Sequence, residues 1–72
     1  MKTGEKIRAM RLKLGMTQEN FALETSLYQR QISNYENCLI IPTRKVLKRI
    51  ADALGVSPES LEGEDIERRT RT

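Results

Sequence analysis

The segment from Gln29 to Glu36 carries a set of polar side chains that can fall on one side of a helix. At about 100° per residue, four of them share an arc of roughly 140°: Gln29, Arg30, Ser33 and Asn34. Ile32 and Tyr35 point to the other side and can anchor the helix to a core. Gln and Asn can form two hydrogen bonds with adenine, Arg favours guanine, and Ser bonds to several bases. This outward face therefore has the chemistry needed to contact base edges.

The sequence offers little for catalysis or metal binding. It has no His and one Cys, so Cys38 lacks an imidazole to activate it, and no Cys/His zinc site can be assembled. Paired carboxylates at motif spacing and a Gly-rich phosphate loop are also missing from the sequence. We therefore expect no enzyme activity, no catalytic residue, no metal and no cofactor, and we interpret Cys38 as a small filler or turn residue.

Helical periodicity dominates the sequence, and strand-like alternation is absent from it. The pattern predicts five helices, at about residues 4–14, 18–24, 29–36, 44–54 and 58–62. Short polar residues are expected to cap four of them: Thr3, Thr17, Thr43 and Ser57. Three glycines are expected to end the first, fourth and fifth: Gly15, Gly55 and Gly63. We predict an all-α fold, a compact five-helix bundle.

One domain over residues 1–63 accounts for the apolar stripes. The first helix places Ile7, Met10 and Leu14 on one face, and the fourth repeats the pattern with Val46, Leu47, Ile50, Ala51 and Leu54. Residues 64–72 contain one apolar side chain, Ile66, and run from acidic to basic. We predict that they form a frayed charged tail or a truncated linker.

The composition points to a soluble protein with a mild preference for polyanions. The chain has 72 residues and a formal net charge of +3, and residues 1–61 hold ten Lys and Arg against six Asp and Glu. No apolar run approaches the roughly 18 residues of a membrane span, and the first residues lack the apolar stretch of a secretory signal. We expect a cytoplasmic protein that does not associate with a membrane.

Two short helices at 18–24 and 29–36, joined by a tight turn, suit a helix-turn-helix, in which the first helix supports the second in the major groove. Ala22 is the small residue expected where these helices come closest. Four segments of the sequence then resemble the Cro/CI-type phage-repressor family of helix-turn-helix domains, also called XRE: Ile7–Arg11, Leu14–Glu19, Ile32–Asn37 and Ile50–Ser57. The resemblance covers roughly residues 4–62.

The resemblance implies a lambda-repressor-like DNA-binding domain with a recognition helix at about 28–36. It implies a sequence-specific transcriptional regulator, namely a repressor, that binds double-stranded DNA as a homodimer on an inverted-repeat operator. The outward face would contact base edges. Phosphate contacts would come from Gln18, Tyr28, Asn37, Arg44 and Lys45. Arg11 and Glu36 would form an internal ion pair that sets the orientation of the recognition helix.

The sequence departs from the family pattern at both ends of the recognition helix. Ser26 stands where relatives usually have Gly in the turn, and Tyr28 stands where they have a Ser or Thr cap. After the helix, the usual Gly and basic residues are replaced by Cys38, Leu39 and Ile40. Leu39 and Ile40 either pack on the fourth helix or form an exposed patch for a protein partner.

The exposed-patch hypothesis supports an alternative function, a protein-interaction module such as an antitoxin or antirepressor with weak DNA binding. The sequence leaves open the operator, the sign of regulation, the gene circuit, the dimer interface and the completeness of the chain.

Overall fold

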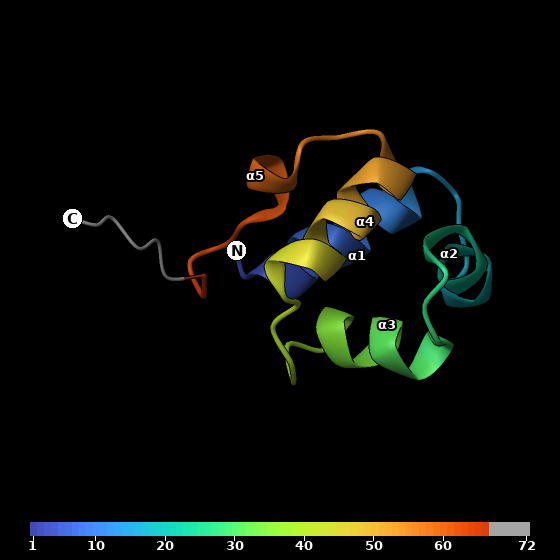
Figure 1. Ribbon diagram of the computed structural model, residues 1–72, viewed down its shortest axis with the longest axis horizontal. Helices are drawn as coiled ribbons and strands as arrows, with labels where there is room; N and C mark the ends of the chain where they lie inside the picture. Colours follow the sequence, from blue (N-terminus) through green and yellow to red (C-terminus); the bar gives the residue numbers. More distant parts are fainter. Residues whose placement is uncertain (67–72) are drawn as a thin grey trace.

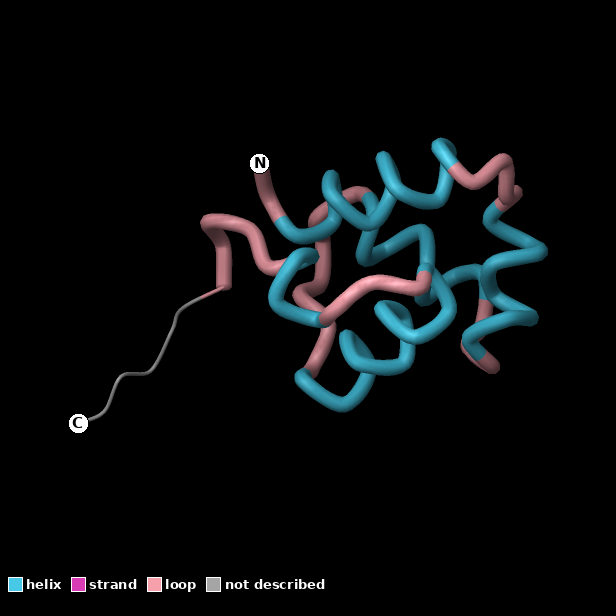
Figure 2. Tube along the Cα trace, turned by 90° about the horizontal axis from the view of Figure 1, so that it is seen from above, coloured by secondary structure: helices cyan, strands magenta, loops and turns pink. Residues whose placement is uncertain are grey.

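The computed structural model describes residues 1–66, which form five α-helices and no strand (Figures 1 and 2). This confirms the predicted all-α, five-helix fold. None of the described helices has the length and the apolar run that crossing a bilayer requires. The helices are α1 (Thr3–Lys13), α2 (Gln18–Thr25), α3 (Gln29–Glu36), α4 (Arg44–Leu54) and α5 (Pro58–Leu61).

Three of the four predicted N-caps are present. The hydroxyls of Thr17, Thr43 and Ser57 each accept a hydrogen bond from the backbone N–H three residues later, at 3.0, 3.3 and 3.3 Å. The prediction for Thr3 is wrong, because Lys2 occupies the cap position and Thr3 is the first residue of α1. The Thr3 side chain is fully buried, and its hydroxyl donates a hydrogen bond to the Asp65 carboxylate near the C-terminal end of the described residues.

Left-handed residues follow the first four helices. Gly15 and Gly55 have φ of 74° after α1 and α4, as predicted. Ser26 (φ 59°) and Cys38 (φ 61°) adopt the same conformation after α2 and α3, although they are not glycines. Gly63 follows Glu62, the C-cap of α5, as predicted, but unlike Gly15 and Gly55 it does not have a positive φ.

The core lies where α1, α2, α3 and α4 meet, and α5 closes it against α1 and α4 (Figure 1). Its largest fully buried apolar side chains come from every helix: Ile7, Phe21, Ile32, Ile50 and Leu61. The apolar stripe of α4 is buried except for Val46, which packs partly exposed at its edge. The prediction that Leu14 belongs to the apolar face of the first helix is wrong. Leu14 lies past the end of α1 and is 48% exposed.

Gly4 allows α1 to pack closely against α3. A Cβ atom at this position would collide with the backbone carbonyl of Tyr35 and press against the Cys38 Sγ. The sequence prediction named Ala22 as the small residue at a close approach. Ala22 is buried, and Gly4 is a second small residue at a close approach, between α1 and α3.

Residues 62–66 form a short segment, which we call the strap, that packs against the N-terminal end of α1 (Figure 1). The Asp65 carboxylate accepts hydrogen bonds from Thr3, and Ile66 packs partly buried against the core. For residues 64–66 the expectation of a frayed tail is therefore corrected. The rest of the predicted charged tail, residues 67–72, lies outside the described residues.

Candidate nucleic-acid interface

Helix α3 has one buried side and one solvent-facing side. Ile32 is fully buried and Tyr35 is 7% exposed, so both anchor the helix as the sequence predicts. On the other side Gln29 and Arg30 are exposed, and Ser33 and Asn34 are half-buried. The part of the fold formed by residues 1–66 does not cover the outward face, which leaves these side chains accessible to a ligand.

The turn between α2 and α3 is closed by backbone hydrogen bonds around Ser26. The N–H of Leu27 donates to the carbonyl of Ala22 at 3.0 Å, and the buried Thr25 hydroxyl donates to the carbonyl of Phe21 at 2.8 Å. Ser26 itself takes the left-handed conformation that a Gly would adopt more easily. The departure at Ser26 is thus accommodated without changing the geometry of a tight helix-turn-helix.

Tyr28 precedes α3 and does not cap it with its side chain. Its own N–H is satisfied instead by Gln31 Oε1 at 2.9 Å, the half of a capping box in which the third helical residue reaches back. The phenol is 79% exposed. Tyr28, Gln29, Arg30 and Gln31 together line a surface hollow of about 450 Å³ at the start of α3.

Sequence reasoning missed the role of Gln31, although a signal was present. A Gln three residues after a cap position is the second half of the capping-box pattern. The missing Ser or Thr at Tyr28 hides this pattern, because the pair is usually sought by its first residue.

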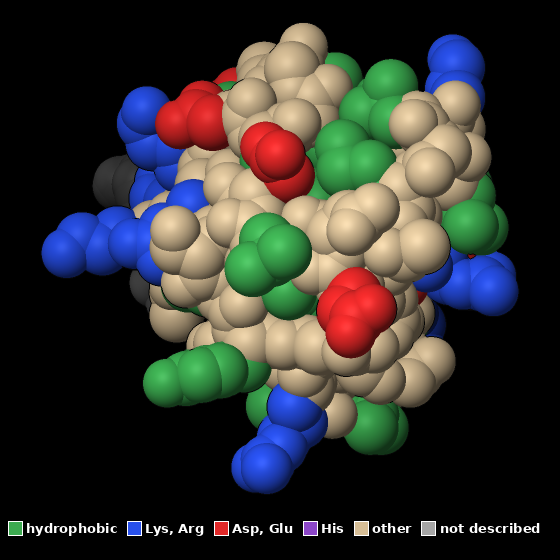
Figure 3. Space-filling view, turned by 90° about the vertical axis from the view of Figure 1, so that its right-hand side faces the viewer, with side chains coloured by type: hydrophobic (Ala, Val, Ile, Leu, Met, Phe, Trp, Pro, Cys, Tyr) green, Lys and Arg blue, Asp and Glu red, His purple; other side chains and the backbone are tan. Residues whose placement is uncertain are grey.

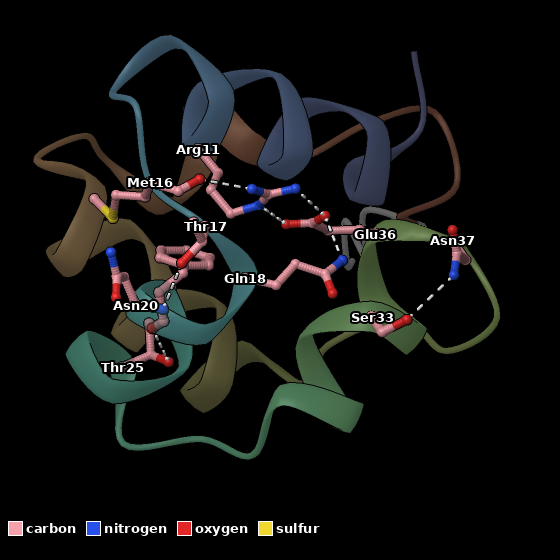
Figure 4. Close-up of polar contacts among 10 residues, drawn as sticks. Arg11, Met16, Thr17, Gln18, Asn20, Thr25, Ser33, Glu36 and Asn37 are labelled. Atoms are coloured by element: carbon pink, nitrogen blue, oxygen red, sulfur yellow. Dashed lines mark hydrogen bonds and ion pairs between the residues drawn. The ribbon is translucent and has the colours of Figure 1, made fainter.

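A buried ion pair fixes the end of α3 to α1 (Figure 4). Arg11 Nε lies 2.6 Å from Glu36 Oε2 and Arg11 Nη2 lies 3.0 Å from Glu36 Oε1, so the guanidinium holds the carboxylate through two hydrogen bonds. The side chains are 7% and 1% exposed. Arg11 Nη1 also donates to the carbonyl of Met16 at 2.7 Å. The structure therefore contains the ion pair that the resemblance implies.

Gln18 joins this network from the first turn of α2 (Figure 4). Its Nε2 donates to Glu36 Oε1 at 3.1 Å, and the residue is half-buried. One N–H of the amide is thus engaged with the protein, while an amide NH₂ has two donors. The carboxylate of Glu36 consequently determines how the Gln18 amide is oriented between α2 and α3.

Asn37 caps the C-terminal end of α3 and contacts the outward face. Its Nδ2 donates to the Ser33 Oγ at 3.3 Å, one helical turn earlier (Figure 4). Because the Ser33 oxygen accepts this bond, its own O–H remains able to donate. A serine held in this way is suited to an acceptor on a base edge or a phosphate.

Arg44 and Lys45 lie apart from these groups. Both are exposed in the first turn of α4 and, with Lys48 and the α5 residues Pro58 and Glu59, line a second hollow of about 400 Å³. The residues of the α3 hollow do not line this one. The structure thus brings Gln18 to Glu36 and Asn37 to Ser33, while Arg44 and Lys45 line a different hollow from the one at the start of α3.

The loop between α3 and α4 presents apolar side chains to solvent. Leu39 is 73% exposed, Ile40 is 50% exposed and Ile41 is 48% exposed. Packing of Leu39 and Ile40 on α4, one of the two predicted possibilities, is therefore wrong. Cys38 occupies the left-handed turn position before them, in agreement with its interpretation as a turn residue.

The α2 side of the molecule has a different character (Figure 3). Carboxylates and apolar side chains lie in the middle of this view among backbone and uncharged polar groups, and Lys and Arg side chains lie at its edges. Helix α2 itself contains Glu19 and Glu24 and no basic residue, and its Leu23 is 78% exposed. Helix α2 therefore offers a polyanion no basic side chain of its own. Within residues 1–66, no cluster of His, Cys, Asp and Glu could hold a metal ion.

Comparisons with known proteins agree with this geometry. A family model described as Helix-turn-helix matches residues 7–61. The chain is similar to the P22 c2 repressor, solved in complex with synthetic operator 9T, with 31% identity over 90% of this chain and 98% of that one and a TM-score of 0.83. A search of functionally curated proteins finds no match.

Two controller proteins of restriction-modification systems are also similar. A mutant of the controller protein C.Esp1396I has 34% identity over 82% of this chain and 77% of that one, with a TM-score of 0.75. C.AhdI from Aeromonas hydrophila shares the fold at 24% identity, with a TM-score of 0.79 over 82% of this chain and 89% of that one.

The family match takes in more than half of the chain and includes both helices of the helix-turn-helix, the buried ion pair and the core of α4. It favours the DNA-binding interpretation over that of a protein-interaction module. The chain belongs to the XRE-type helix-turn-helix family of DNA-binding transcription regulators.

Proposed function

We propose that the protein is a sequence-specific repressor that binds an inverted-repeat operator as a homodimer, with α3 in the major groove. The observation that carries this proposal is the outward face of α3, which is polar and open while Ile32 and Tyr35 hold the helix to the core. The similar P22 c2 repressor was solved in complex with a synthetic operator, which supports the same mode of binding here.

The base contacts are assigned to the outward face. Gln29 and Asn34 can each pair with adenine through an acceptor and a donor, and Arg30 can donate twice to guanine. Ser33, whose oxygen accepts from Asn37, would act mainly as a donor. Each good bidentate pair discriminates against a wrong base by about 1–3 kcal/mol.

The phosphate contacts would flank this face on both sides. Gln18 offers the amide N–H that Glu36 does not engage, and the exposed Tyr28 hydroxyl and Asn37 amide lie at the two ends of α3. Arg44 and Lys45 would reach the backbone from the start of α4. Such contacts fix register and orientation but carry no sequence information.

A homodimer would match the two-fold symmetry of the proposed inverted-repeat operator. Two recognition helices in successive major grooves lie about 34 Å apart, one turn of B-DNA. The regulator is expected in the cytoplasm, on the nucleoid of a bacterial or phage-infected cell. Leu39 and Ile40 are the proposed contact for a protein partner, because they are exposed and apolar.

Selection of bound fragments from a random duplex pool, followed by sequencing, tests the proposal directly. A palindromic motif with half-sites about one helical turn apart is the expected outcome. A pool without any enriched motif would contradict sequence-specific binding.

Variants then assign the contacts by mobility shift on the selected site and on mixed fragments. Gln29→Ala and Arg30→Ala should each remove most of the preference for the selected site. The matched control is Arg49→Ala, which removes an exposed Arg on α4 and should leave the preference intact. If both α3 variants keep the parental preference while Leu39→Asp abolishes regulation, the protein acts through a protein partner instead.

A further inference from the structure

The strap is joined to the start of α1 by contacts that span about 60 positions of sequence. Thr3 N–H and Thr3 Oγ1 both donate to Asp65 Oδ1, at 2.9 and 2.8 Å, and the Gly63 N–H donates to Thr3 Oγ1 at 2.9 Å. Lys6 Nζ donates to the carbonyl of Glu62 at 2.9 Å, and the Glu64 N–H donates to the carbonyl of Met1 at 3.2 Å. The strap is therefore hydrogen-bonded both to the first turn of α1 and to the residues before it.

The Asp65 carboxylate accepts the first N–H of α1, that of Thr3, from outside the helix. The first N–H groups of a helix have no partner within the helix, and a negative charge is stabilised beside them. Thr3, at the first position of α1, is fully buried, so its N–H and hydroxyl need partners from the protein. Asp65 supplies both partners through a single oxygen atom.

The fit between the strap and α1 is tight at Gly63. A Cβ atom there would collide with the backbone of Met1, Lys2 and Thr3. The collision would involve backbone atoms and not a flexible side chain, so the strap cannot yield locally. Any side chain at residue 63 would lift the strap away from α1 without altering Asp65 itself.

The first turn of α1 is one of two places where α1 contacts the end of α3. Gly4, next to Thr3, lies against the carbonyl of Tyr35, and Arg11 holds Glu36 at the other end of α1. The last turn of α3 is thus fixed to α1 at two points. One depends on the ion pair, and the other depends on the position of the Thr3–Gly4 backbone.

We infer that Asp65 is a positioning residue for the DNA interface, acting through Thr3 and Gly4 on the C-terminal turn of α3. Its effect on DNA affinity rests on the proposed function, whereas its effect on α3 does not. Removing the carboxylate frees the first turn of α1, which loosens its contact with Tyr35 and lets the end of the recognition helix shift. Energetic coupling across packed elements of this kind commonly changes an equilibrium by about twofold to thirtyfold.

The test uses the full 72-residue chain and amide hydrogen exchange measured by NMR. Thr3 and Lys6 report on the start of α1, because their N–H groups are bonded to Asp65 and to the Lys2 carbonyl. Cys38 and Leu39 report on the end of α3, because their N–H groups are bonded to the carbonyls of Tyr35 and Asn34.

Four variants are compared with the parent. Asp65→Ala removes the acceptor, and Asp65→Asn keeps an oxygen that can accept from Thr3. Gly63→Ala lifts the strap but leaves Asp65 in the chain. Asp52→Asn is the matched control, because its carboxylate is 69% exposed on α4 and far less constrained.

With Asp65→Ala, exchange at Thr3 and Lys6 should accelerate about tenfold or more, the loss expected for a hydrogen bond to a charged group. Exchange at Cys38 and Leu39 should accelerate about threefold to tenfold, and operator affinity should fall by a similar factor. Gly63→Ala should act in the same direction, Asp65→Asn should recover part of both effects, and Asp52→Asn should change neither.

Two outcomes would overturn the inference. Acceleration limited to α1, with α3 exchange and affinity unchanged, would mean that Asp65 caps α1 and nothing more. Equal acceleration in α2 and α4 would mean general destabilisation. If the parent binds no operator at all, the proposed function fails, while the exchange at Cys38 and Leu39 still decides whether the strap positions α3.

Discussion

The buried pair of Arg11 and Glu36 allows a sharp test of what holds the recognition helix in place. Removing one member of a buried ion pair costs about 3–5 kcal/mol, because the remaining charge stays buried without its partner. A domain of this size has a total stability of about 4–11 kcal/mol, from 0.05–0.15 kcal/mol per residue. Glu36→Leu or Arg11→Met should therefore remove a large part of the free energy of unfolding.

The double variant separates the ion pair from the rest of the packing. Arg11→Met with Glu36→Leu replaces both charges by apolar groups, a change that is often neutral or stabilising at such sites. We expect the double variant to be more stable than either single variant, although the carbonyl of Met16 loses its donor and Gln18 loses its acceptor. The coupling free energy between the two positions should reach about 3 kcal/mol.

Urea unfolding followed by helical circular dichroism measures these free energies, with the slope of each transition checked for constancy. The control is the exposed pair of Lys48 and Asp52, whose side chains are 70% and 69% exposed and whose charged atoms are 3.9 Å apart. Asp52→Asn should change stability by no more than about 0.5 kcal/mol. If the losses of the two single variants simply add in the double variant, the buried pair does not act as a unit and the argument is refuted.

Three further predictions concern other features. Ser26→Gly should raise the free energy of unfolding by about 0.5–1 kcal/mol, because relief of the left-handed strain exceeds the extra freedom of the unfolded chain. Thermal melting measures this change. Gly15→Ala is the control and should lower the free energy of unfolding by a similar amount. Desolvation raises the pKa of Asp65, but hydrogen bonds from the Thr3 backbone and hydroxyl outweigh it and hold the pKa below its ordinary value of 3.8. The stability contributed by ionised Asp65 is therefore full above about pH 4 and is lost as the pH falls through the lower folded-state pKa. The urea midpoint should drop less over this acid range in Asp65→Asn than in the parent, and equal drops would count against the assignment. Leu39→Lys should steepen the plot of log affinity against log salt by about one unit on nonspecific DNA, and an unchanged slope in fluorescence anisotropy would show that the α3–α4 loop lies away from phosphates.

The helices could be predicted from the sequence because their signals are local. Thr17 and Thr43 lie next to the turns that they cap, and Gly55 follows the last residue of α4. The outward face of α3 was also predictable, since a helix with Ile32 and Tyr35 buried must direct Gln29 and Arg30 to solvent. In each of these cases, neighbours within one or two turns determine the outcome.

The remaining features depend on contacts between distant parts of the chain. Thr3 has the residue type of a cap, but its hydroxyl is used by Asp65, a partner that local patterns cannot reveal. Gly63 resembles a glycine that ends a helix. Its lack of a side chain is also required because a Cβ atom there would collide with the backbone of residues 1–3. Leu39 follows the left-handed Cys38 and is 73% exposed, so its apolar character did not predict burial.

Ser26, in the turn before the recognition helix, and Cys38, in the turn after it, both adopt a left-handed conformation that suits neither residue type. Neither residue belongs to the outward face. Glycine at both positions would therefore stabilise the folded domain without altering the side chains proposed to contact the bases. Libraries that randomise the four residues of the outward face would then start from a more stable parent protein. More of their members would stay folded, and variants directed to new operators could be recovered from a smaller screen.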